Sequence, residues 1–206
     1  MLQTEVAMAL SLPDYQRILA RTKNAADPVI LAFAGVIWLA LQAGKSPLIR
    51  GLAEDRFQRM LAAYFPGLIL ANGETSSDDA RYDEFADVLQ LLLEYRVEAS
   101  EERAWLCYAI ASASMGDNHL WQDMGLPNRN ALSELMAQNF PRLKALNAGD
   151  MKWKKFFYRQ LCERAHIPIC KSPSCAICTD YKICFGTEEL EGQTKSIPVV
   201  LVKSTS

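Results

Sequence analysis

Four of the six cysteines stand close together near the C-terminus, in the sequence CKSPSCAICTDYKIC. Cys170, Cys175, Cys178 and Cys184 follow the spacing C-x4-C-x2-C-x5-C. Thiolates are soft ligands that select iron-sulfur clusters, zinc or copper(I), and four of them can hold either an iron-sulfur cubane or a tetrahedral zinc ion. We therefore predict that these four residues bind a metal centre.

The spacing favours an iron-sulfur cluster over zinc. The first three cysteines have the C-x4-C-x2-C spacing of plant-type ferredoxins, whereas zinc sites more often pair two short Cys-x-x-Cys units across a longer insert. Two alternatives stay open at this point. One is a structural zinc site in an interaction module, and the other is a simple electron carrier with an ordinary cluster.

Both histidines of the chain are further candidate ligands, because imidazole is a common metal ligand. His119 could equally be a capping or packed histidine in a turn between helices. His166 precedes Cys170 by four residues, and it could equally lie at the C-terminal end of a helix, where a partly charged imidazole is favoured. Cys107 and Cys162 fall within predicted helices and are interpreted as inert buried thiols, although Cys162 is near enough in sequence to be a spare ligand.

Basic residues surround the cysteines, although the whole chain has a formal net charge of −2. A thiolate-ligated cluster is negatively charged, so nearby cations would stabilise it and could also attract an oxyanion. The other interpretation is an ordinary solvated helix face, since Lys155, Arg159 and Glu163 are four residues apart. The basic residues in question are Lys152, Lys154, Lys155, Arg159, Arg164, Lys171 and Lys182.

Helices are the elements that must position these residues. Asp27-Pro28 before an apolar run and Ser100 before Glu101 and Glu102 are typical helix N-termini. Helical spacing of apolar residues predicts six helices, over 28–43, over 57–65, from Phe85 onward, from Ser100 to about Met115, over 130–139 and over 153–165. Pro141 and Gly149 are expected to separate the last two. On the last of these, Trp153, Phe156, Phe157 and Leu161 are expected to pack in the core.

The expected fold is therefore all-α, a multi-helix body with a C-terminal cysteine-rich cluster-binding loop. We divide the chain into a helical domain over 1–165, a Cys-rich metal-cluster loop over 166–186 and a flexible tail over 187–206. Strand-like alternation is confined to 197–202, and one short apolar run near a terminus does not make a sheet.

Composition excludes several functional classes. Six cysteines, four of them clustered, do not form the disulfide framework of a small secreted protein. The N-terminus has no basic region before an apolar run, and the apolar stretch 29–43 is shorter than the roughly 20 residues that span a bilayer. A pI near 5.8 argues against nucleic-acid binding. No nucleophile-base pattern, phosphate loop or Rossmann fingerprint is present. We expect a cytoplasmic metal carrier that is neither a membrane protein nor a turnover enzyme.

Two blocks of the sequence resemble the NifQ family of molybdenum nitrogenase assembly. One is 151–186, MKWKKFFYRQLCERAHIPICKSPSCAICTDYKICFG, whose cysteine spacing is similar to the family's pattern; the other is 115–126, MGDNHLWQDMGL, followed by 130–140. His119 lies in the second block.

The resemblance implies an accessory protein that binds a molybdenum-iron-sulfur cluster and donates molybdenum for biosynthesis of the iron-molybdenum cofactor. It implies as partners the nitrogenase cofactor-assembly scaffold complex, the nitrogenase iron protein, and molybdate or another molybdenum source. Our hypothesis is that three of the cysteines hold iron, while the fourth or a neighbouring histidine completes the molybdenum corner. Transfer of the metal requires exchangeable ligation at one corner.

The rival from another class is an iron-sulfur DNA glycosylase of the endonuclease III kind, which is also helical and carries a C-terminal loop ending in C-x2-C-x5-C. The first gap here is four residues rather than six, and no helix-hairpin-helix segment for gripping phosphates is found. The acidic pI also disfavours duplex binding.

Overall fold

The computed structural model describes residues 15–74, 81–166, 181–186 and 188. All regular elements in these ranges are helices, which confirms the all-α class. The run 197–202, most of the predicted Cys-rich loop, and the predicted tail apart from Glu188 lie outside the described residues. The helices are α2 (Tyr15–Leu19), α3 (Pro28–Gln42), α4 (Glu54–Tyr64), α5 (Tyr82–Tyr95), α6 (Glu101–Ser114), α7 (Leu120–Asp123), α8 (Arg129–Asn139), α9 (Pro141–Leu146), α10 (Trp153–Arg164) and α11 (Tyr181–Phe185).

Three of the long helices, α3, α6 and α8, begin at a residue whose side chain caps them. The carboxylate of Asp27 accepts a hydrogen bond from the Val29 backbone N–H at 2.8 Å, with Pro28 in the first helical turn. The Ser100 hydroxyl accepts from the Arg103 N–H at 3.3 Å. The Asn128 side chain does the same for the N–H of Ala131 at 2.9 Å. These contacts satisfy backbone donors that have no partner inside the helix, so local sequence sets these helix starts.

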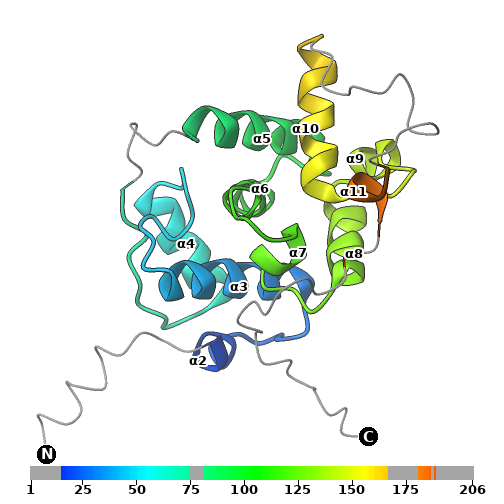
Figure 1. Ribbon diagram of the computed structural model, residues 1–206. Coiled ribbons are helices and arrows are strands. Elements are labelled where there is room, and N and C mark those ends of the chain that lie inside the picture. Colours follow the sequence, from blue (N-terminus) through cyan, green and yellow to red (C-terminus); the bar gives the residue numbers. More distant parts are fainter. Residues whose placement is uncertain (1–14, 75–80, 167–180, 187, 189–206) are drawn as a thin grey trace, which may run out of the picture.

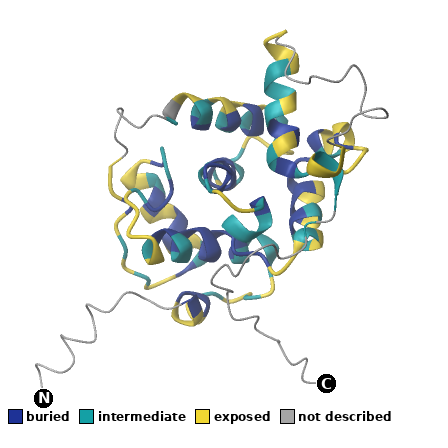
Figure 2. Cartoon of the chain, in the orientation of Figure 1, coloured by how far each residue is buried: buried dark blue, intermediate teal, exposed yellow. Residues whose placement is uncertain are grey.

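Helix α6 lies at the centre of the molecule, with α3, α4, α5 and α7 packed against it (Figure 1). From Ala104 to Ser114 its residues are buried, except Tyr108 and Ser112, which are half-buried (Figure 2). An apolar helix without a polar face must be enclosed by other elements. The surrounding helices therefore form a shell, and α10 joins this shell through α5.

Short helices are the main departure from the sequence prediction. Helices α2, α7, α9 and α11 contain only four to six residues, too few to show a periodic pattern. Pro141, which we expected to separate two helices, instead begins α9, because proline is favoured at the first helical position. Helix α11 lies inside the segment 166–186 that we predicted as a loop.

None of the described helices is both long enough and apolar enough to cross a lipid bilayer.

Candidate metal centre

Cys184 is the one predicted cysteine ligand among the described residues; Cys170, Cys175 and Cys178 lie outside them. It belongs to α11, is half-buried, and packs against the core together with Phe185. The backbone N–H of Lys152, the residue before α10, donates to the Cys184 carbonyl oxygen at 2.8 Å. Cys184 is thus placed beside the N-terminal end of α10.

Apolar contacts support this position of α11. The rings of Tyr181 and Phe185 are stacked, with centroids 4.5 Å apart. Phe185 also covers Gly149, where a Cβ atom would lie 3.3 Å from its ring. The glycine therefore lets the turn before α10 approach α11 closely.

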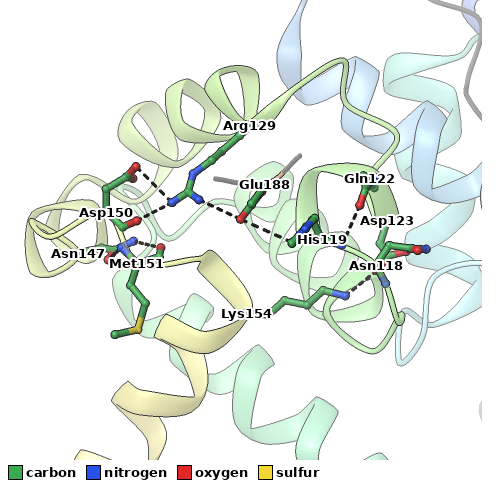
Figure 3. A network of polar contacts seen from close by, with 10 residues as sticks. All are labelled: Asn118, His119, Gln122, Asp123, Arg129, Asn147, Asp150, Met151, Lys154 and Glu188. Atoms are coloured by element: carbon green, nitrogen blue, oxygen red, sulfur yellow. Dashed lines mark hydrogen bonds and ion pairs between the residues drawn. The ribbon is translucent and has the colours of Figure 1, made fainter. Parts of the chain in front are cut away.

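A buried carboxylate follows α11. The side chain of Glu188 is only 6% exposed, and its Oε1 lies 3.0 Å from Nη1 of Arg129 and 3.8 Å from Nδ1 of His119 (Figure 3). Arg129 begins α8, and His119 directly precedes α7. The contacts bring the end of the cysteine segment onto the first residues of two helices of the body.

Arg129 is also bound to the turn between α9 and α10. Its Nη2 donates to the Asp150 backbone carbonyl at 2.6 Å and lies 3.2 Å from the carboxylate of Asp150 (Figure 3). Asp150 has a left-handed backbone, with φ of 52°. The side chain of Asn147, which is buried, bonds both the N–H and the carbonyl of Met151 and so fixes this turn.

The His119 segment is held by its own polar contacts. Gln122 Oε1 accepts from the His119 backbone N–H at 3.0 Å, and the Asp123 carboxylate accepts from the Asn118 backbone and side-chain amides. Lys154 on α10 donates to Asp123 at 2.6 Å and to the Gly116 carbonyl at 2.8 Å. Burial lowers the pKa of Lys154, although the attraction of Asp123 opposes this shift. His119 thus occupies the turn position that we gave as the alternative to a ligand role, while its imidazole faces Glu188.

His166 lies at the other end of the segment. It follows α10 with φ of 53°, is exposed, and its backbone N–H donates to the Glu163 carbonyl at 3.3 Å. This left-handed residue ends the helix, as we allowed for His166 at a helix C-terminus. Its role as a ligand stays a prediction.

Three of the basic residues near the cysteines form ion pairs with carboxylates of the helical body. Lys154 pairs with Asp123, Arg159 pairs with Glu163 at 2.6 Å on an exposed face, and Arg164 pairs with Glu94 at 2.8 Å. The exposed Arg159 pair confirms the solvated-face interpretation for that residue. On the opposite side of α10 Trp153, Phe156 and Phe157 are buried, as predicted for core positions, with Leu161 half-buried against them.

The remaining cysteines differ in access. Cys107 is fully buried in α6, and burial raises the pKa of its thiol to about 12, which makes it unreactive. Cys162 on α10 is half-buried rather than fully buried. The inert interpretation therefore holds for Cys107.

Within the part of the chain that the structure describes, no three His, Cys, Asp or Glu side chains are grouped as metal ligands. What the described residues contribute is the fixed position of Cys184 and the polar network beside it. Sequence reasoning missed Arg129, Glu188 and Asn147 in this network. The one available signal was the place of Arg129, directly after the capping residue Asn128 and close to the His119 block.

Comparison with known proteins identifies the family. A family model described as NifQ matches residues 32–186. The chain is 36% identical over 158 residues to Protein NifQ of Azotobacter vinelandii, covering 69% of this chain and 80% of that protein. It is 38% identical over 149 residues to Protein NifQ of Rhodobacter capsulatus (71% and 82%) and 36% identical over 168 residues to Protein NifQ of Klebsiella pneumoniae (72% and 94%). No solved structure matches. The matched region includes both blocks of the sequence that resemble the family, and the chain belongs to the NifQ family.

Proposed function

We propose that this protein binds a molybdenum-iron-sulfur cluster through Cys170, Cys175, Cys178 and Cys184 and donates its molybdenum for biosynthesis of the nitrogenase iron-molybdenum cofactor. Membership of the NifQ family indicates a role in nitrogen fixation and in the biosynthesis of this cofactor. The cluster is the cargo of the protein rather than a resident catalytic group. The protein then acts in the cytoplasm as a metal carrier and not as a turnover enzyme.

The observation that carries the proposal is the four-cysteine spacing, which lies inside the matched region 32–186. Four thiolates suit the soft metals of such a cluster. Cys184 is half-buried beside the start of α10, where it packs against the core. A ligand in this position can be held by the body and still meet a cluster brought by the other three cysteines.

The proposed partners are the cofactor-assembly scaffold complex and the nitrogenase iron protein, with molybdate or another molybdenum source upstream. His119 and His166 are the proposed candidates for a non-cysteine ligand at the molybdenum corner. Of the two, His166 is exposed at the end of α10, whereas His119 faces the Glu188 carboxylate at 3.8 Å. This arrangement favours His166 as the more accessible imidazole.

Metal analysis of protein purified anaerobically from molybdate-supplied cells tests the proposal. We expect iron together with molybdenum and a brown visible spectrum, all lost in the double variant Cys175→Ser/Cys178→Ser. Cys162→Ser is the matched control, because it removes a half-buried thiol of α10 outside the set of four, and it should retain both metals.

Other outcomes separate the alternatives. Iron without molybdenum would contradict the donor role and favour an electron carrier. Zinc in colourless protein would make the site a structural module. The DNA-glycosylase alternative predicts retardation of duplex DNA in a gel-shift assay, which we do not expect for this chain.

A further inference from the structure

Residues 181–186 and Glu188 are attached to the body by contacts that involve no metal. These are the Lys152 N–H bond to the Cys184 carbonyl, the packing of Phe185 on the core, and the pairing of Glu188 with Arg129 and His119. We infer that Arg129 is a positioning residue, whose ion pair with Glu188 holds Cys184 in place before any metal binds. We call this Arg129–Glu188 pair the latch. The purpose of that placement rests on the proposed cluster binding, whereas the latch itself does not.

The Glu188 side chain provides the strongest part of this argument. Transfer of a carboxylate from water to a buried position is costly unless a cation and hydrogen bonds compensate it. The Glu188 side chain is 6% exposed, and among the described residues its hydrogen-bond donor is Arg129 Nη1 at 3.0 Å, with His119 Nδ1 at 3.8 Å beside it. A charge-assisted hydrogen bond of this kind is among the strongest side-chain contacts in proteins. We therefore expect Glu188 to leave the body when Arg129 is replaced by an uncharged residue.

Arg129 is itself fixed independently of the segment that it holds. Its Nη2 is bound to the carbonyl and carboxylate of Asp150, and the side chain of Asn147 fixes the turn that contains Asp150. One edge of the planar guanidinium is thus bound to the body, and Nη1 is presented to Glu188 (Figure 3). Lysine cannot make both contacts with this geometry, because its ammonium group is a single point charge.

The latch acts on Cys184 through a short stretch of chain. Glu188 follows Cys184 by four positions, and Phe185 between them packs against the core. The bond from Lys152 to the Cys184 carbonyl fixes the chain at Cys184, and the bond from Arg129 to Glu188 fixes it again four positions further on. Cys184 is then the ligand that the folded body places.

Site-resolved alkylation of the metal-free, reduced full-length chain tests the latch. Trypsin cleavage after Lys182 and Lys195 gives a peptide whose only cysteine is Cys184, and cleavage after Arg159 and Arg164 gives one whose only cysteine is Cys162, so both rates are read from one digest. In Arg129→Met we expect N-ethylmaleimide to modify Cys184 about tenfold faster or more, because the contact that suppresses local opening is gone. The Cys162 rate should not change.

Three further variants make the test specific. Glu188→Gln removes the partner charge from the segment without altering the body, and it should reproduce the faster reaction of Cys184. Arg129→Lys, which retains the charge, should restore part of the protection. Arg59→Met is the matched control, since Arg59 forms exposed ion pairs with Asp55 and Glu101 on the other side of the molecule, and the Cys184 rate should stay at the wild-type value.

An unchanged Cys184 rate in both Arg129→Met and Glu188→Gln, with native far-UV circular dichroism, would overturn the latch. If Arg129→Met fails to fold, Glu188→Gln decides the matter alone. Because these rates are measured without metal, a wild-type chain that binds only zinc would refute the proposed function and leave this inference standing. If the wild-type chain binds iron and molybdenum but the Cys184 alkylation rate is unchanged in both variants, the proposed function stands and the latch is refuted.

Discussion

Lys154 and Asp123 form a largely buried ion pair between α10 and the segment that contains His119. Their side chains are 17% and 13% exposed, and Nζ lies 2.6 Å from the carboxylate. Asp123→Asn would leave the Lys154 charge buried without a counter-charge. We expect this change to lower the free energy of unfolding by about 3 kcal/mol, measured by urea denaturation. Glu163→Gln is the control, because it removes a carboxylate from an exposed pair and should cost only about 0.5 kcal/mol. An equal loss of unfolding free energy in the two variants would show that burial does not strengthen the Lys154–Asp123 pair.

The burial of Lys154 also predicts how the stability of the protein depends on pH. Burial lowers the pKa of Lys154 in the folded chain below its ordinary value of 10.5. Between the folded and unfolded pKa values the unfolded chain binds more protons, so the contribution of Lys154 to stability rises with pH in that window. Wild-type protein should therefore gain stability relative to Lys154→Met as the pH is raised toward 10.5. A stability difference that stays constant with pH in urea denaturation would exclude this effect.

At the scale of elements, α3 approaches the turn after α7 through Gly35. A Cβ atom at this position would overlap the Met124 carbonyl oxygen and lie 2.7 Å from Cα of Gly125. Both are backbone atoms of the block that resembles the family, and they cannot turn away as a flexible side chain would. Alanine is the better helix former by about 1 kcal/mol, but we expect Gly35→Ala to destabilise the protein by about 2 kcal/mol because the two elements must separate.

Ala62→Gly is the control for Gly35→Ala, because it changes helix propensity at a position without close packing. Ala62 is exposed on α4, so the change should cost about 1 kcal/mol in denaturant unfolding. If Gly35→Ala proves more stable than the wild-type chain, the close approach does not limit the packing of these elements.

At the scale of the whole molecule, the described hydrophobic core is built without the cysteine ligands. Its buried members run from Tyr15 to Phe157, and Cys184 and Phe185 only pack against its edge. Removal of bound metal by a chelator should therefore leave the far-UV circular dichroism and a single cooperative thermal transition, with Cys175→Ser/Cys178→Ser as the matching metal-free chain. Loss of the helical signal on metal removal would instead indicate a body that folds only with its metal, as small zinc domains do.

The sequence by itself determined the features that depend on neighbouring residues. Asp27 and Ser100 cap the helices that they were predicted to cap, because a cap acts within three residues of the chain. The core face of α10 follows from its own spacing, and the cysteine pattern with the His119 block was sufficient to indicate the family. Helices α2, α7, α9 and α11 escaped prediction, since a helix of four to six residues is stabilised by its packing rather than by its own periodicity.

Only the tertiary structure decided which distant residues meet. Arg129 and Glu188 are 59 residues apart, and Lys154 and Asp123 are 31 apart. How strongly such opposite charges attract depends on the separation and burial that the complete fold imposes, and no local pattern encodes either quantity. For the same reason, the glycine in α3 that admits Met124 and Gly125 looks like any small residue in an apolar helix until the two elements are packed together.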